Sequence, residues 1–191
     1  MPSDVRHFFL VAKTLITFYS YVTPTRNGTQ IMKTLIFALT LTATSLAYAD
    51  SADIVVNGLS WHSHPPVAEG YHWNQLNTGL AVQYQHDMGN FAIVAQAGFM
   101  KDSVDLWGPY AIASAQYVVR SGDFSAGVGP AIGAAYRGNH FNGPHQLDPL
   151  GGLDVTLRYR DAGVNILAAP AINDQPAIIF TNFTYRFWSG K

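Results

Sequence analysis

The chain has 191 residues, enough for one domain; 48% of them are hydrophobic, 13% aromatic and only 12% charged, whereas an average soluble domain has about 25% charged residues. The formal net charge of −1 excludes the basic surface that nucleic-acid binding requires. The apolar and aromatic content excludes intrinsic disorder. The absence of cysteine excludes disulfides, thiol catalysis and cysteine-ligated zinc. Low charge without long apolar runs indicates a protein that contacts lipid through alternate residues.

Residues 32–49 have the layout of a secretory signal peptide. Lys33 precedes an apolar stretch, which ends in Ala47-Tyr48-Ala49, the A-x-A pattern of a cleavage site. The apolar stretch is shorter than the roughly 20 residues of a transmembrane helix. We therefore expect residues 1–31 to be an upstream extension with no structural role and residues 50–191 to form the folded domain. The alternative is a longer targeting segment or an anchor helix that includes residues 8–21.

Residues 50–191 alternate repeatedly between apolar and polar side chains and show no sustained helical pattern. In residues 179–187, Phe183 and Tyr185 fall on one face, and Asn182 and Arg186 on the other. Eight such segments are predicted as strands, and they begin near Ile54, Leu76, Phe91, Trp107, Phe124, Pro149, Gly163 and Ala177.

The predicted connections alternate in length. Tight turns follow the second, fourth and sixth strands, whereas residues 63–75, 101–106 and 137–148 form longer loops. This arrangement predicts an all-β fold, an eight-stranded antiparallel transmembrane β-barrel of the bacterial outer membrane. Aromatic residues at strand ends fit interfacial girdles: Trp61, Trp73, Tyr84, Trp107, Tyr117, Tyr136, Tyr159 and Tyr185. The alternative is a soluble lipocalin-like barrel, whose core would have to accommodate the polar second face of these strands.

Strand direction sorts the inward residues by height. In the half near the long loops we expect Gly79, Ala81, Gly98, Ala131, Gly133, Gly152 and Phe180. In the other half we expect Gln83, Gln85, Gln116, Arg158, Thr184 and Arg186. This predicts a roomy upper lumen that accepts one apolar chain, above a polar floor. The alternative is that the small residues only fit the taper of a narrow barrel.

Three short motifs lie at the long-loop end: Ser60-Trp61-His62, Lys101-Asp102-Ser103 and Trp107-Gly108-Pro109. Histidine, aspartate and serine can supply the base, the orienting group and the hydroxyl of an acyl-transfer site. Taken singly, the same residues also fit a polar rim and the start of a turn.

In order and context these motifs resemble the PagP-type lipid A palmitoyltransferases of Gram-negative outer membranes. In that family a Trp-His pair ends the first strand, a Lys-Asp-Ser follows the third, and a Trp-x-Pro comes four residues after the Ser, as here. The resemblance spans most of residues 53–187. It implies an outer-membrane acyltransferase without a cofactor, active as a monomer, that moves an acyl chain from a glycerophospholipid to lipid A. It implies His62, Asp102 and Ser103 as catalytic residues at the extracellular face, with His62 as the general base.

The resemblance also implies where the acyl chain lies. Ser114 falls where palmitoyl-selective members carry a glycine that sets the pocket depth, so a chain of palmitoyl length or shorter is expected. Gly98, Gly133 and Phe180 are expected to line the same pocket. The alternative is that Ser114 belongs to the polar floor with Gln116, and that the pocket ends higher, at Phe180.

Other classes of function are compatible with the same sequence. One is a non-enzymatic structural or adhesion barrel whose long loops bind a partner, and another is a lipid A deacylase.

A metal site formed by His62, His64 and His72 would have no nearby carboxylate other than Glu69. In the PagP-type family, prolines weaken strand pairing where lipid enters from the side, and the resemblance implies Pro149 and Pro170 for this role here.

Overall fold

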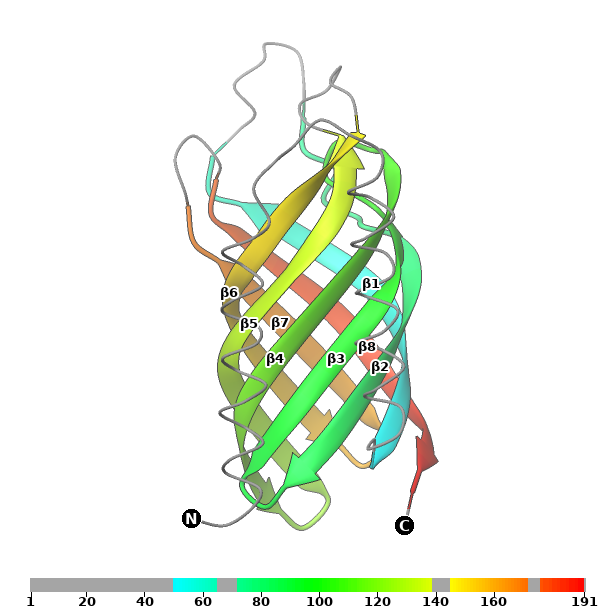
Figure 1. The fold of residues 1–191 in the computed structure, drawn as a ribbon, viewed down its shortest axis with the longest axis vertical. Helices are drawn as coiled ribbons and strands as arrows, with labels where there is room; N and C mark the ends of the chain where they lie inside the picture. Colours follow the sequence, from blue (N-terminus) through cyan, green and yellow to red (C-terminus); the bar gives the residue numbers. More distant parts are fainter. Residues whose placement is uncertain (1–49, 65–71, 139–144, 172–175, 191) are drawn as a thin grey trace.

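The computed structural model describes residues 50–64, 72–138, 145–171 and 176–190. Within them, eight antiparallel strands form one closed barrel, in which each strand pairs with its sequence neighbours and β1 pairs with β8 (Figure 1). The strands are β1 (Ser51–His62), β2 (Gly79–Met88), β3 (Phe91–Lys101), β4 (Trp107–Ser121), β5 (Phe124–Gly138), β6 (His145–Tyr159), β7 (Ala162–Ala169) and β8 (Ile178–Ser189). The expected eight-stranded barrel is confirmed, and the expected signal peptide and upstream extension lie outside the described residues.

The connections at the two ends of the barrel differ as predicted, with one exception. Left-handed residues make the tight turns: φ is 66° at Gly89, 57° at Gly122 and 52° at Arg160, as two-residue hairpins require. The expected loop at residues 137–148 is wrong, because β5 and β6 stay paired up to Gly138 and His145. Backbone pairing continues there although the apolar alternation of the side chains has ended.

The outer face of the barrel is apolar. Val128, predicted to face lipid, is 43% exposed. Large apolar side chains are exposed on seven of the eight strands, all except β7, among them Ile54, Leu80, Phe99, Val119, Val128, Leu153, Leu157, Ile179 and Phe183. Such a surface is costly in water and favourable in hydrocarbon, so it identifies a transmembrane barrel. No helix in the described part of the chain is long and apolar enough to span a membrane.

Most of the expected aromatic girdle lies on the outer face. Trp61 and Trp107 are exposed near the long loops, and Tyr117, Tyr159 and Tyr185 near the tight turns. Trp73 is an exception to the prediction. It lies in the connection between β1 and β2, where its indole stacks on the ring of His62 instead of facing lipid.

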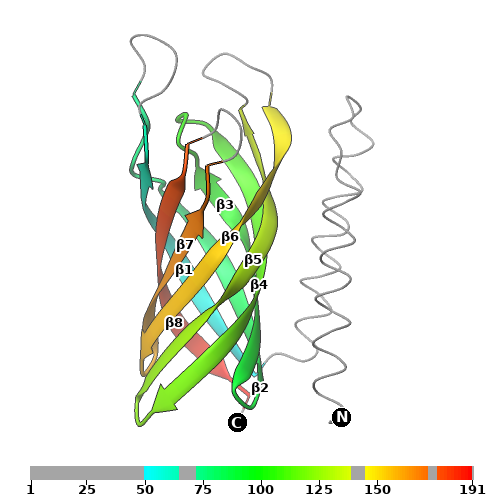
Figure 2. The same ribbon diagram turned by 90° about the vertical axis from the view of Figure 1, so that its left-hand side faces the viewer.

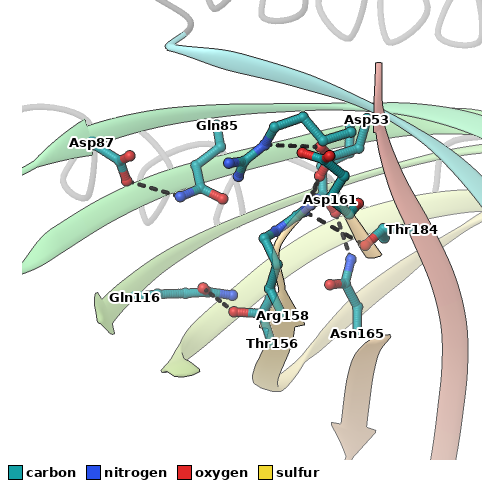
Figure 3. Close-up of polar contacts among 11 residues, drawn as sticks. Asp53, Gln85, Asp87, Gln116, Thr156, Arg158, Asp161, Asn165 and Thr184 are labelled. Atoms are coloured by element: carbon teal, nitrogen blue, oxygen red, sulfur yellow. Dashed lines mark hydrogen bonds and ion pairs between the residues drawn. The ribbon is translucent and has the colours of Figure 1, made fainter. Parts of the chain in front are cut away.

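The lower lumen is a polar floor, as predicted. Asp53, 1% exposed, forms an ion pair with Arg158 and accepts a 3.0 Å hydrogen bond from Gln83 Nε2. Arg186 Nε lies 3.7 Å from the second oxygen of Asp53. Figure 3 shows Asp53 and Arg158 of this group together with Asn165 of β7 and Thr184 of β8. Because opposite charges and amides satisfy one another, the floor is compatible with a surrounding membrane.

The upper lumen is apolar but not roomy, which corrects the prediction. Phe180 packs with Ala131 and Leu167, and Met100 and Ile112 pack against both this cluster and a second one around Tyr110. The inward glycines leave little free volume, since a Cβ at Gly98 would lie 2.7 Å from Ala81 Cα. The glycines therefore allow neighbouring strands to approach closely, which is the alternative reading of a narrow, tapering barrel.

Candidate functional site

His62 ends β1 on the lumen side of the barrel mouth. Its side chain is buried, 8% exposed. Its ring stacks on the indole of Trp73, with 4.6 Å between the ring centroids and 14° between the planes. Trp73 is itself anchored, because its Nε1 donates a 2.8 Å hydrogen bond to the carbonyl oxygen of His64. The imidazole is therefore held in one orientation at the rim.

Asp102 begins the turn between β3 and β4. Its Oδ1 accepts hydrogen bonds from the backbone N–H groups of Val104 (3.0 Å) and Leu106 (2.8 Å), and Asp105 in this turn has a left-handed φ of 69°. The side chain is 4% exposed, and Oδ2 has no hydrogen-bond partner among the described residues. One oxygen thus stabilises the turn, as the structural interpretation predicted, while the other is available for a further contact.

Asn74 joins the turn to the segment that holds His62. Its Nδ2 donates to the carbonyl oxygen of Asp102 (3.0 Å), and its backbone N–H donates to the carbonyl oxygen of Ser103 (2.9 Å). On the other side, Ser60 Oγ donates to the carbonyl oxygen of Asn74 at 3.4 Å. Three segments distant in the sequence therefore meet at one side of the mouth.

No pattern in the sequence assigns Asn74 a role of its own. It stood out only as part of the Trp73-Asn74 pair that resembles the PagP-type family. Its bonds to two carbonyl oxygens depend on the register between strands, and no local pattern encodes that register.

The third motif, residues 107–109, does not enter the site. Trp107 is exposed on the outer face and stacks on Phe99, with 5.7 Å between the centroids. Pro109 pairs in register with Phe99 at the start of β4. This motif therefore anchors the turn of Asp102 and Ser103 at the level of the long loops.

The predicted pocket residues lie below the mouth at two levels. Phe180, Gly98 and Gly133 lie on strands that line the apolar upper lumen. Ser114 lies in a polar layer: its Oγ donates a 2.7 Å hydrogen bond to Asp154 Oδ2 and lies 3.2 Å from Gln116 Nε2. These contacts favour the interpretation in which Ser114 belongs to the floor and the apolar pocket ends higher.

Tyr110 separates these two levels. Its side chain is 4% exposed, its hydroxyl donates to Asn57 Oδ1 at 2.7 Å, and it accepts a hydrogen bond from Gln96. The bonds run from β4 to β1 and β3, so the phenol is fixed across the lumen. The residues predicted at this height are mostly small and do not include Tyr110, although the alternation of β4 puts Tyr110 on the same face as Ser114 and Gln116.

One wall of the mouth is incompletely paired within the part of the chain that the structure describes. β7 ends at Ala169, just before Pro170, and its pairing with β6 begins only at Leu153. Among the described residues, nothing on the β7 side pairs with the upper part of β6, which contains Pro149 (Figure 2). Residues 172–175, which follow Pro170 and Ala171, lie outside the described residues, so the expected weakening near the two prolines stays a prediction.

A metal centre has no support in the described residues, in which no group of three or more His, Asp or Glu side chains could hold an ion. His64 is instead engaged locally, with its Nδ1 2.9 Å from Ser63 Oγ. Glu69, the carboxylate considered for such a site, lies outside the described residues.

No protein-family model and no curated protein sequence matches the chain. Two solved structures of Ail, the attachment invasion locus protein of Yersinia pestis, are similar at 15% and 13% identity, each with a TM-score of 0.33. Each match covers 72% of this chain and 97% of Ail, and the first structure is a complex with the heparin analogue sucrose octasulfate. A likeness at this level assigns no activity to the chain.

Proposed function

We propose that this barrel is an outer-membrane acyltransferase that moves an acyl chain from a glycerophospholipid to lipid A at the extracellular face. The observation that carries the proposal is the convergence of His62 with the Asp102–Ser103 turn, through Trp73 and Asn74, above an apolar lumen. A base, a carboxylate and a hydroxyl at the rim are the groups that acyl transfer needs.

The proposed reaction is a direct transfer without a cofactor. The imidazole of His62 takes the proton of a lipid A hydroxyl, and that oxygen attacks the ester carbonyl of the phospholipid. The carbon–oxygen bond to glycerol then breaks, and the imidazolium returns the proton to the departing lysophospholipid alkoxide. The free Oδ2 of Asp102 and the hydroxyl of Ser103 would orient or polarise the reacting groups.

Lipid access is part of the proposal. The upper edge of β6 near Pro149, which pairs with no described residue on the β7 side, offers a place where a phospholipid tail could pass from the membrane towards the mouth.

The test is mass spectrometry of lipid A from strains with and without the protein. An additional acyl chain is expected with the wild-type protein and not with His62→Ala or Ser103→Ala. Asp102→Asn is preferred to Asp102→Ala, because the amide oxygen can still accept the turn bonds that Oδ1 makes. His64→Ala, at the same mouth, is the matched control and should retain transfer. Heat-modifiable migration in gels checks that each variant folds.

A second candidate function is a non-enzymatic barrel whose long loops bind a partner. The filled lumen favours it: Tyr110 is fixed across the barrel, and Met100, Ile112 and Phe180 pack around it, so side chains must move before an acyl chain can enter. Unchanged lipid A in a strain with a correctly folded barrel would favour this candidate, and loss of an acyl chain would indicate a deacylase.

A further inference from the structure

The wall between β4 and β5 is interrupted halfway along its length. Pairing runs from Tyr110↔Ala135 to Ser114↔Ala131 and resumes at Tyr117↔Val128, so Ala115 and Gln116 are not paired with Gly129 and Pro130. Pro130 has no N–H to donate. The pairing of β5 with β6 is continuous from Phe124 to Gly138, so the missing donor falls on the β4 side.

Side chains cross this interruption on the lumen side. Asp154 of β6 accepts hydrogen bonds on Oδ2 from Ser114 Oγ at 2.7 Å and from Gln116 Nε2 at 2.8 Å. Thr156 Oγ1 donates to Gln116 Oε1 at 2.9 Å (Figure 3). β4 and β6 are not neighbours in the barrel, so each of these bonds passes over β5 and ties together the two strands that flank it.

The inward residues of β5 are glycines where the bonds pass. A Cβ at Gly127 would lie 2.7 Å from Thr156 Oγ1 and would also collide with Gln116 Oε1. A Cβ at Gly129 would lie 2.8 Å from Gln116 Cα. Glycine at these two positions therefore leaves the space in which side chains of β4 and β6 meet.

Asp154 has no part in the proposed acyl transfer, and among the described residues no lysine or arginine pairs with it. A buried carboxylate without a cation is unfavourable unless several donors compensate it. An interrupted ladder in hydrocarbon is unfavourable for a similar reason, since backbone groups there have no water to bind. The buried carboxylate of Asp154 and the interrupted β4–β5 ladder lie next to each other. This proximity indicates that the side-chain bonds to Asp154 compensate for the missing backbone pairing.

We infer that the β4–β5 wall contains a weak seam at Gly129–Pro130, and that Asp154 is the residue that keeps this seam closed from inside the lumen. The inference goes beyond the proposed function and does not depend on it. It assigns a conformational role to the Ser114, Gln116, Asp154 and Thr156 cluster: loss of the cluster opens this wall locally, whereas the other walls keep their backbone pairing.

Amide hydrogen exchange of the full barrel in detergent micelles tests the inference. In Asp154→Leu, we expect the amides that face across this wall, those of Ala115, Tyr117 and Val128, to exchange at least tenfold faster, while amides of the uninterrupted β2–β3 pair stay unchanged. Asp154→Asn, which keeps one acceptor oxygen, should show a smaller increase at the same amides. If Asp154→Leu does not fold, the exchange rates of Asp154→Asn test the inference. Tyr110→Phe removes the hydrogen bonds of the other lumen cluster and is the matched control, with no change at the seam.

Pro130→Val provides a second, independent test of the inference by hydrogen exchange. Pro130 is exposed on the outer face, so valine is accommodated there and restores a donor to the ladder. We expect slower exchange at the seam in the otherwise wild-type protein and a reduced effect of Asp154→Asn in the double variant. The inference is overturned if exchange rises equally in all strands of the Asp154 variants, if it does not rise at the seam, or if Pro130→Val leaves the Asp154→Asn effect unchanged.

Discussion

Replacement of Asp53 by alanine tests the energetics of the lumen floor most directly. The side chain of Asp53 is 1% exposed, that of Arg158 is 10% exposed, and the two form an ion pair. Without the carboxylate, the Arg158 guanidinium keeps contacts with the Asp161 carbonyl oxygen at 3.2 Å and with Thr184 Oγ1 at 3.5 Å. Arg186 loses the same anion.

The expected loss in free energy of unfolding is about 3–5 kcal/mol, the usual cost of removing one partner from a buried pair. Asp123→Ala is the matched control, because Asp123 pairs with Arg160 at the surface, where their side chains are 54% and 66% exposed. An exposed pair contributes about 0–1 kcal/mol, so this variant should unfold almost like the wild type.

Urea titration of the barrel in lipid vesicles, followed by tryptophan fluorescence, measures both values. A third variant, Asp53→Leu with Arg158→Met, should recover part of the stability, since it removes the buried Arg158 charge together with its partner and leaves only the less buried Arg186 without this anion. The reasoning would be refuted if Asp53→Ala and Asp123→Ala lost equal stability, or if the double variant were less stable than Asp53→Ala.

Three further predictions concern the outer face, the rim and the lumen. Val128→Arg should lower the free energy of unfolding by roughly 2–4 kcal/mol, and Val119→Arg, nearer the tight turns, by about 1 kcal/mol or less, because the cost of a charge falls towards the interface; vesicle folding assays measure both. Asn74→Ala should reduce acyl transfer on the order of 10- to 100-fold, because it releases the Asp102 carbonyl and displaces the rim groups; an unchanged rate of lipid A acylation in a folded variant would contradict this. Tyr110→Ala should lengthen the transferred chain while Ser114→Gly leaves it unchanged, because Tyr110 lies across the lumen above the hydrogen-bonded Ser114; the reverse outcome in lipid A mass spectra would restore Ser114 as the residue that sets the chain length.

The architecture could be predicted from the sequence because it depends on local patterns. Alternation along residues 179–187 assigns the faces of β8, and short turns around Gly89 and Gly122 fix the hairpins. Every predicted strand begins within four residues of an observed one. The composition of the two faces also distinguishes the face that contacts lipid from the face that lines the lumen. Hydrocarbon favours apolar side chains, whereas a narrow polar interior favours polar ones.

The members of the candidate site could be named from the sequence, but their arrangement could not. His62 and Asp102 stand out as residue types at strand ends, whereas the link through Trp73 and Asn74 requires the connection after β1 to lie against the turn after β3. The burial of Asp102 and the engagement of its Oδ1 within the turn likewise follow from that packing. Replacement of Asp102 is therefore expected to lower the stability of the turn more than replacement of a solvent-exposed residue of the rim would.

The sequence by itself determined the number of strands, their direction and which side chains face lipid, since each of these follows from periodicity and turn chemistry over a few residues. Only the tertiary structure decided what fills the lumen. Closure of the barrel sets the height at which Tyr110 meets Asn57 and at which Asp154 reaches Ser114 across β5. Those heights depend on the stagger between strands, a property of the whole ring that no single segment encodes.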